Sequence, residues 1–131
     1  MKRVKDMVAA ANKKVAHKPA AEMLESHEAE GVTFVDLRDP RELERDGMIP
    51  GAFHCPRGML EFWIDSESPY AKEQFQTGNQ FVFYCASGWR SALSAEVAQD
   101  MGLENVSHIT DGFGGWKKAG GPVGEKPSKK G

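Results

Sequence analysis

The sequence has little of what marks several large classes of protein. Cysteine occurs only twice among 131 residues, as Cys55 and Cys85, which is too few for a disulfide framework and points to a reducing compartment. No stretch approaches the ~20 consecutive apolar residues of a membrane span, and the apolar run at residues 7–11 is too short for a signal-peptide core. The net charge of −2 lacks the basic excess expected of a nucleic-acid-binding surface. We therefore expect a soluble cytoplasmic protein with no membrane or nucleic-acid partner.

Length and composition predict one domain with an extension at each end. A chain of 131 residues with 40% hydrophobic residues can bury an ordinary core. Residues 1–18 are basic and alanine-rich, and we interpret them as an N-terminal helical extension with its helix over residues 2–15. The main domain is expected over residues 19–123. The chain beyond Gly120 lacks core residues and is expected to be loose, and residues 124–131 are expected to form a flexible tail.

Strand-like and helical segments alternate along the rest of the chain. This alternation predicts an α/β fold whose mostly parallel sheet is covered by helices on both faces. Asp39 and Pro40 are typical of a helix cap followed by the first helical residue. Strands are expected over residues 32–37, 52–55, 80–84 and 106–109. Helices are expected over residues 20–30, 40–45, 70–76, 91–101 and 113–118, with either a short helix or a packed loop over residues 59–64.

Cys85 is the candidate nucleophile because of the segments on either side of it. The apolar strand at residues 80–84 ends on this thiol, and the loop Ala-Ser-Gly-Trp-Arg-Ser at residues 86–91 leads into the next helix. Reactive groups in parallel sheets lie at the carboxyl ends of strands. Converging loop N–H groups and a helix N-terminus supply positive potential that stabilises a thiolate. The sequence therefore predicts nucleophilic cysteine chemistry.

The spacing between Cys85 and Arg90 narrows that chemistry. Four residues separate them, and Gly88 lets the loop curl so that several N–H groups converge above the sulfur. Arg90 places a permanent positive charge at the rim, where it suits an incoming oxyanion. Cysteine phosphatases use a related loop with one more intervening residue, whose wider ring holds a tetrahedral phosphate. The shorter loop favours a carrier of one extra sulfur atom, and a phosphatase or arsenate reductase is the alternative.

Three separated motifs resemble those of the rhodanese family of sulfurtransferases. The first is the loop Cys-Ala-Ser-Gly-Trp-Arg-Ser at residues 85–91. The second is Val-Asp-Leu-Arg-Asp-Pro-Arg-Glu at 35–42, continued by Ile-Pro-Gly-Ala-Phe-His at 49–54 and Pro-Arg-Gly at 56–58. The third is Asp-Gly-Phe-Gly-Gly-Trp at 111–116, followed by Gly-Gly-Pro-Val at 120–123. The resemblance runs in the family's order and departs from it where Met48 replaces a histidine of structural role.

The resemblance implies a rhodanese-like fold with a five-stranded sheet, and a two-step sulfur transfer. Cys85 would take a sulfane sulfur from a small anionic donor such as thiosulfate and carry it as a persulfide. Cyanide or a thiol, which includes a protein thiol, would accept that sulfur. The loop would bind the substrate through its N–H groups and its arginine, and its residues are Ala86, Ser87, Gly88, Trp89, Arg90 and Ser91. The family implies no metal and no cofactor. The oligomeric state stays open between a monomer and a homodimer, and a non-catalytic interaction module is the other alternative for the function.

Several further residues carry weaker signals. Asp36, at the end of a strand beside the expected site, is interpreted as a cap for the next segment. Cys55 is interpreted as a packing residue, because adjacent residues on a strand point to opposite faces and no metal-ligand spacing surrounds it. Its part in redox chemistry stays open. If the loop holds a ligand, Trp89 is not expected to be buried like a core aromatic. A hydrophobic wall or lid that selects the acceptor is one hypothesis for its role.

The remaining histidines, arginines and aromatic residues are expected to be structural or solvated. Surface or internally satisfied positions are expected for His17, His27 and His108. Solvated surface positions are expected for Arg41 and Arg57. Core packing is expected for Phe62, Trp63, Tyr70 and Trp116, with an exposed docking face as the alternative for the first three.

Overall fold

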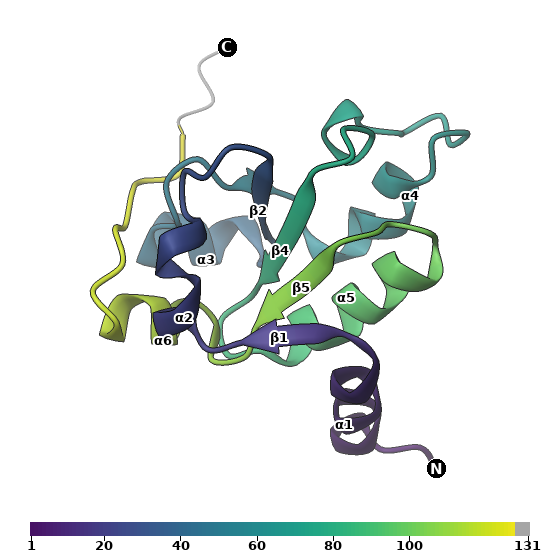
Figure 1. Ribbon diagram of the computed structural model, residues 1–131, viewed down its shortest axis with the longest axis horizontal. Helices are drawn as coiled ribbons and strands as arrows, with labels where there is room; N and C mark the ends of the chain where they lie inside the picture. Colours follow the sequence, from purple (N-terminus) through teal and green to yellow (C-terminus); the bar gives the residue numbers. More distant parts are fainter. Residues whose placement is uncertain (128–131) are drawn as a thin grey trace.

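The computed structural model describes residues 1–127 as a central sheet with helices packed against it (Figure 1). The helices are α1 (Val4–Lys14), α2 (Ala20–Met23), α3 (Pro40–Asp46), α4 (Leu60–Ile64), α5 (Trp89–Asp100) and α6 (Gly112–Lys118). The strands are β1 (Ala16–Lys18), β2 (Val32–Asp36), β3 (Phe53–His54), β4 (Gln80–Tyr84) and β5 (Val106–Ile109). Short 3₁₀ turns span Leu24–Ser26, Arg57–Met59 and Glu73–Phe75.

The five strands lie in the order β1-β5-β4-β2-β3, and every neighbouring pair is parallel. This confirms the predicted parallel α/β fold. The central strand β4 pairs with β2 from Val32 opposite Gln80 to Asp36 opposite Tyr84, so the carboxyl ends of these strands lie side by side. A group that follows β4 is therefore placed at the edge of the sheet where α/β proteins bind their ligands.

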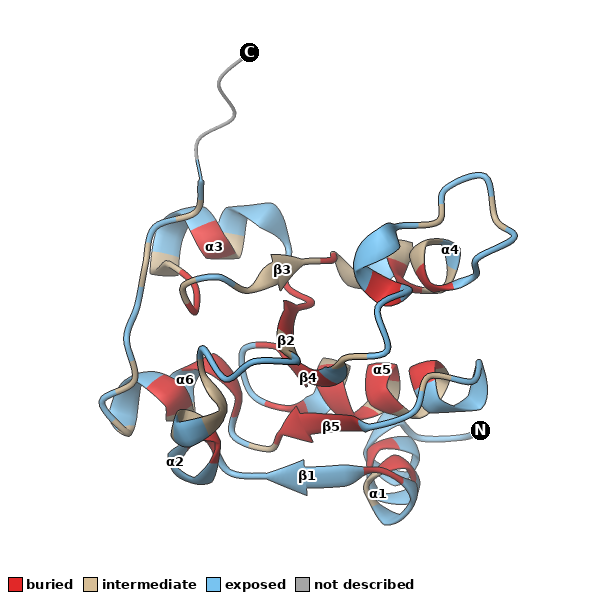
Figure 2. Ribbon diagram, turned by 45° about the horizontal axis from the view of Figure 1, so that its top comes forward, coloured by how far each residue is buried: buried red, intermediate tan, exposed pale blue. Residues whose placement is uncertain are grey.

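Alternate residues of β4 supply the cores on the two faces of the sheet. Phe81 and Phe83 join a cluster on the face of α4 and α5, whereas Val82 and Tyr84 join a second cluster on the face of α2 and α6. Burial on both faces explains why the strand reads as a continuous apolar run. The prediction of helices on both faces is confirmed, and Figure 2 shows β4 and β5 buried in the centre of the molecule.

The edge strand β1 was absent from the sequence prediction. Its residues Ala16, His17 and Lys18 are all exposed, and they pair with residues 107–109 of β5 (Figure 2). A polar segment of three residues carries no apolar alternation, so only its partner strand reveals it. The preceding helix α1 begins at Val4 and ends at Lys14, close to the predicted residues 2–15.

Two predicted helices are shorter in the structure. The helix expected over residues 20–30 ends at Met23 and continues only as the turn Leu24–Ser26. The helix expected over residues 70–76 is reduced to the turn Glu73–Phe75, in which Phe75 is the buried residue. Short helices in proteins depend on a buried face, and a single buried side chain anchors a turn more readily than a helix.

The chain after Gly120 is tied to the domain. The indole N–H of Trp116 donates to the Pro122 carbonyl at 2.8 Å, and Gly124 forms an antiparallel bridge with Met48 through two backbone hydrogen bonds. The expectation of a loose chain directly beyond Gly120 is therefore wrong. The tail expected over residues 124–131 begins on this paired glycine, and its residues 128–131 lie outside the described part. No helix among residues 1–127 is long and apolar enough to cross a bilayer.

Candidate active site

Cys85 follows the last residue of β4, and α5 begins four residues later at Trp89. The Cys85 side chain is buried, with 1% of the residue exposed, while Ala86 and Ser87 of the loop are exposed. The loop therefore curls over the sulfur and turns its first two side chains to solvent. The strand places the thiol, and the amino-terminal end of α5, whose first N–H groups lack partners within the helix, completes the loop.

The Gly88 N–H donates to the Cys85 Sγ at 3.1 Å. This is one of the main-chain dipoles that the sequence predicted around the sulfur. Gly88 has a φ of 109° in the left-handed region, and a Cβ at this position would lie 2.2 Å from the Thr110 carbonyl oxygen. A side chain would be both strained and sterically blocked here, so the loop geometry requires glycine.

The start of α6 supports the loop from the opposite side. The Phe113 N–H donates to the Cys85 carbonyl at 2.8 Å, and the Gly114 N–H donates to the Ala86 carbonyl at 3.3 Å. Gly112 has a φ of 60°, and a Cβ on it would lie 2.5 Å from the Ala86 carbonyl oxygen. Two glycine-dependent contacts, one at Gly88 and one at Gly112, thus hold the cysteine loop in one conformation.

Arg90 is paired with a carboxylate that the sequence analysis did not assign to the site. Its two terminal N–H groups donate to the Glu42 carboxylate at 2.8 and 3.0 Å. Hydrogen bonding from the guanidinium lowers the pKa of Glu42 to about 2. The permanent charge predicted for Arg90 therefore has a carboxylate partner within the protein. Because the partners are 48 positions apart in the sequence, no local spacing could have revealed the pair.

Helix capping positions Glu42. The Asp39 side chain accepts from the backbone N–H of Arg41, and Glu42 Oε1 accepts from the Asp39 N–H at 3.0 Å, which forms a capping box at the start of α3. This confirms the cap predicted at Asp39 and Pro40. Glu42 Oε1 thus serves the cap and Arg90 together, so the first turn of α3 is linked directly to the loop of α5.

Ser91 connects Cys85 to His108, a second residue that the sequence analysis did not assign to the site. Its Oγ lies 3.7 Å from Cys85 Sγ and 2.9 Å from Nδ1 of His108 on β5. Both Ser91 and His108 are buried, and burial is the main cause that lowers the pKa of His108 to about 4. His108 was expected to be a satisfied structural residue, and the structure shows that it is satisfied by a residue of the cysteine loop.

The carboxylate of Asp36, at the end of β2, has a structural role as the partner of Arg38. It accepts from the backbone N–H of Arg38 at 3.0 Å and from the Arg38 guanidinium at 3.0 and 2.8 Å. The capping interpretation of Asp36 agrees with these contacts. The guanidinium carbon of Arg38 also lies 4.3 Å from the Phe113 ring centroid. This buried pair joins β2 to α6 and uses both of its charges internally.

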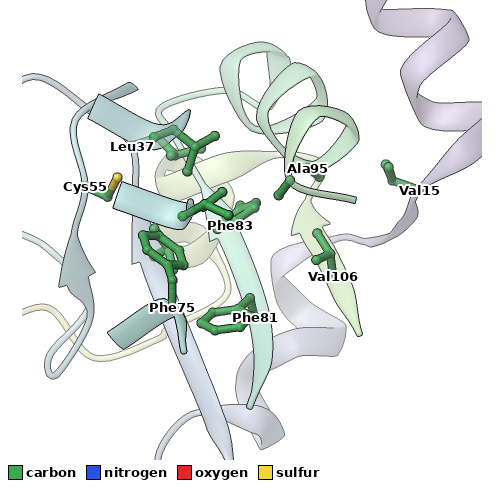
Figure 3. Close-up of a cluster of buried hydrophobic side chains, with 12 residues drawn as sticks. Val15, Leu37, Cys55, Phe75, Phe81, Phe83, Ala95 and Val106 are labelled. Atoms are coloured by element: carbon green, nitrogen blue, oxygen red, sulfur yellow. The ribbon is translucent and has the colours of Figure 1, made fainter. Parts of the chain in front are cut away.

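Cys55 lies in the apolar cluster between the sheet and α4, as Figure 3 shows with Leu37 and Phe75. It is fully buried, and burial raises the pKa of its thiol to about 12. A thiol of this kind is almost entirely protonated at neutral pH and is a poor nucleophile. The geometry agrees with the interpretation of Cys55 as a packing residue.

Three aromatic side chains are exposed. Trp89 is half exposed beside the cysteine loop, and Phe62 and Tyr70 contact each other with ring centroids 6.3 Å apart. Core packing is therefore wrong for Phe62 and Tyr70. Trp63 is partly buried against Phe53, and Trp116 is fully buried as expected. Exposure of Trp89 at this place is compatible with the predicted wall or lid.

The other histidines and arginines that the sequence singled out have partners within the protein. His27 contacts the Pro50 carbonyl oxygen at 2.8 Å, and His17 Nδ1 lies 3.0 Å from the Val15 carbonyl oxygen. Arg57 pairs with Glu61 on the next helical turn at 2.8 Å. Arg41 is exposed, as predicted, and its Nε lies 3.5 Å from the Asp39 carboxylate. None of these side chains contributes to the cysteine loop through a hydrogen bond within the described residues.

Comparison with protein families assigns most of the chain to a known group. A family model for the rhodanese-like domain matches residues 19–119. A sulfurtransferase of Allochromatium vinosum is 28% identical over 96 residues, which cover 73% of this chain and 81% of that protein. The dual specificity phosphatase Cdc25 of Arabidopsis thaliana is 26% identical over 118 residues, which cover 83% of this chain and 77% of that protein.

Comparison with solved structures gives a more similar relative. RPA3614 of Rhodopseudomonas palustris, a protein of unknown function described as a possible tyrosine phosphatase, is 55% identical. It superposes with a TM-score of 0.91 over 94% of this chain and 95% of its own. A rhodanese-related protein of Thermoplasma volcanium is 25% identical, with a TM-score of 0.66 over 85% of this chain and 99% of its own.

Proposed function

Because the chain belongs to the rhodanese-like domain family, we propose that it is a sulfurtransferase that carries a sulfane sulfur as a persulfide on Cys85. The observation that carries the proposal is the 3.1 Å hydrogen bond from the Gly88 N–H to the Cys85 sulfur. It lies in a loop in which four residues separate Cys85 from Arg90. A fixed dipole directed at the sulfur stabilises the anion that must attack and that must later leave. The sulfurtransferase of Allochromatium vinosum among the relatives supports the same chemistry.

The transfer takes place in two displacements at sulfur. The Cys85 thiolate attacks the outer sulfur of a donor such as thiosulfate, a new S–S bond forms, and the old S–S bond breaks as sulfite leaves with its electron pair. A nucleophile, either cyanide or a thiolate, then attacks the outer sulfur of the persulfide. The bond to Cys85 breaks, and the cysteine leaves as the thiolate that began the cycle, so no external oxidant or reductant is consumed.

The chain's own residues would act on charge and position. The Gly88 N–H would hold the sulfur that develops negative charge in both steps, and the loop N–H groups of residues 86–91 would face the outer sulfur. Arg90 would attract an anionic donor. Because the Glu42 carboxylate already accepts one hydrogen bond from each terminal nitrogen of Arg90, an anionic donor that binds to these N–H groups must compete with that carboxylate.

Mass spectrometry tests the proposal directly. After incubation with thiosulfate the wild-type protein should gain the mass of one sulfur atom, located on the peptide that contains Cys85, and cyanide should remove it. Cys85→Ala should gain nothing, and Cys55→Ala should behave as wild type because Cys55 is buried and protonated. A Cys85→Ala protein that still converts thiosulfate and cyanide would refute the assignment.

A phosphatase is the second candidate, because one of the similar proteins is described as a dual specificity phosphatase and another as a possible tyrosine phosphatase. The same loop would then use Cys85 to attack phosphorus, and Arg90 to bind the equatorial oxygens. The four-residue spacing argues against it, since the ring is smaller than that of cysteine phosphatases. Release of phosphate from an aryl phosphate, lost in Cys85→Ala, would favour this candidate, and no release together with persulfide formation would exclude it as the main activity.

A further inference from the structure

The basic N-terminal helix α1 reaches the active cysteine through a chain of side chains. Asn12 of α1 contacts His108 of β5, with 2.7 Å between Asn12 Oδ1 and His108 Nε2. His108 Nδ1 lies 2.9 Å from Ser91 Oγ, and Ser91 Oγ lies 3.7 Å from Cys85 Sγ. Asn12 precedes residues 19–119, which the family model matches, so this contact is contributed by a segment outside that match.

The donor and acceptor atoms determine which way the protons point along this series of hydrogen bonds. An amide oxygen only accepts, so the proton of a neutral His108 lies on Nε2 and is donated to Asn12. Nδ1 is then an acceptor, and it receives the hydroxyl proton of Ser91. The Ser91 oxygen is left to face Cys85 with a lone pair, which can accept from the S–H group of a thiol but repels a thiolate.

The distances around Ser91 agree with this direction. The single hydroxyl proton of Ser91 has three neighbours that can accept it: His108 Nδ1 at 2.9 Å, the Gly88 carbonyl oxygen at 3.2 Å and Cys85 Sγ at 3.7 Å. The two shorter contacts both lead the proton away from the sulfur. The Gly88 N–H opposes this effect by donating to the sulfur, so two hydrogen bonds of opposite influence meet on one atom.

We propose that Asn12 and His108 are positioning residues that set the balance between thiol and thiolate at Cys85. Asn12 fixes the tautomer of His108, and His108 holds the Ser91 proton away from the sulfur, so the network withholds from Cys85 a hydrogen-bond donor that a thiolate would accept. The inference rests on the proposed function only in taking Cys85 as the reacting group.

The variant Asn12→Asp should reverse the direction of the hydrogen bonds between His108, Ser91 and Cys85. A carboxylate beside Nε2 favours the doubly protonated imidazolium, in which Nδ1 also becomes a donor. The Ser91 oxygen then accepts from Nδ1–H and its proton turns to the sulfur, where it stabilises the thiolate. A negative charge acting only through space would do the opposite, because it disfavours a second anion nearby. The sign of the change therefore separates the two explanations.

The matched control is Gln99→Glu, which makes the same change of charge at another contact between α5 and α1. The Gln99 amide donates to the Lys14 carbonyl at 3.1 Å and contacts neither His108 nor Ser91. Other charged or titratable groups lie around the network. The His17 ring of β1 is 5.9 Å from the His108 ring, and Arg90 of α5 interacts with Glu42 of α3 and with Asp36 of β2. All four residues are unchanged in both variants, so their effects cancel in the comparison.

The experiment measures the rate of iodoacetamide alkylation of the peptide containing Cys85 between pH 5 and 10. Asn12→Asp should move the midpoint of the pH–rate profile down by about one pH unit, which is about tenfold more thiolate below both midpoints. Gln99→Glu should leave the midpoint in place. A midpoint that stays or rises in Asn12→Asp overturns the proposal.

A spectroscopic measurement keeps the proposal testable if Asn12→Asp does not fold. In the wild-type protein labelled with ¹⁵N-histidine, the proton of neutral His108 should reside on Nε2, and a proton on Nδ1 overturns the proposal. Neither measurement depends on sulfur transfer. If Asn12→Asp shifts the midpoint but the wild-type protein forms no persulfide, this inference holds and the sulfurtransferase proposal fails. If the wild-type protein forms the persulfide but Asn12→Asp does not lower the midpoint, the sulfurtransferase proposal holds and this inference fails.

Discussion

Arg90 donates one N–H from each terminal nitrogen to Glu42, at 2.8 and 3.0 Å, although the two residues are 48 positions apart in the sequence. The pair joins the first turn of α3 to the first turn of α5, and it places a carboxylate against the cation of the cysteine loop. We therefore expect Glu42 to influence both the binding of anions at Arg90 and the stability of the protein in acid.

Loss of the Glu42 charge should improve binding of an anionic donor. In Glu42→Gln the amide can still accept from Arg90, but the guanidinium is no longer neutralised. A partly exposed ion pair is worth about 1 kcal/mol, so the apparent KM for thiosulfate should fall about fivefold with little change in kcat. Arg90→Ala should raise that KM.

Glu44→Gln on the same helix is the matched control, because it removes the same charge from an exposed position. Steady-state kinetics with thiosulfate and cyanide measure all three variants. If Glu42→Gln raises KM as Arg90→Ala does, the pair acts as a structural unit, and competition between Glu42 and the donor is excluded.

Because of His108, the free energy of unfolding should decrease as the pH is lowered from 6.5 to 4. Burial lowers its pKa from 6.5 to about 4, so over this range the unfolded chain binds a proton that the folded chain does not. Lowering the pH therefore favours unfolding by up to about 3 kcal/mol, and stability is fully regained above pH 6.5. Urea unfolding at several pH values should show this slope, and His108→Gln should lack it.

Glu42 should act in a separate, more acidic window. Its folded carboxyl titrates at about 2 against an ordinary value of 4.5, so its contribution is present above pH 4.5 and is lost as the pH falls toward 2. Solvent around the half-exposed Arg90 reduces this contribution to about 1–2 kcal/mol. In Glu42→Gln the free energy of unfolding should depend less on pH below pH 4.5, and the pH dependence attributed to His108 should be unchanged. A change only above pH 4.5 would contradict the assignment.

The cysteine loop should tolerate no side chain at Gly88. Gly88 and Gly102 both have a φ of 109°, but a Cβ at Gly102 would meet nothing within 4 Å, whereas one at Gly88 would meet the Thr110 carbonyl at 2.2 Å. Gly102→Ala should cost about 1 kcal/mol from backbone strain alone. Gly88→Ala should cost about 3 kcal/mol and abolish persulfide formation. Equal losses of stability and activity in the two variants would show that the contact with Thr110 is unimportant.

The two thiols should differ in reactivity by orders of magnitude. Cys55 is buried in an apolar cluster with its pKa raised to about 12, so at pH 7 only about one molecule in 10⁵ carries a thiolate there. Iodoacetamide at neutral pH should label the peptide with Cys85 and leave the peptide with Cys55 unlabelled. A disulfide between the two cysteines after oxidation, detected by non-reducing peptide mapping, would restore a resolving role for Cys55.

Sequence alone determined the features that depend on neighbours along the chain. The apolar run at residues 80–84 predicted a strand of the sheet, Asp39 and Pro40 marked the start of α3, and the spacing of Cys85, Gly88 and Arg90 located the loop. Each of these depends on backbone geometry and burial within a few residues, which the order of residue types records directly.

Only the tertiary structure decided which distant side chains complete the site. Glu42 reaches Arg90 because parallel pairing places α3 and α5 at the same edge of the sheet, and His108 reaches Ser91 because β5 lies beside β4. Asn12 joins them through a helix that the three-residue strand β1 positions. Such contacts arise from pairing between remote segments, and no local pattern of residues encodes them, so the charge at the rim and the hydrogen bonding of the sulfur became visible only in the fold.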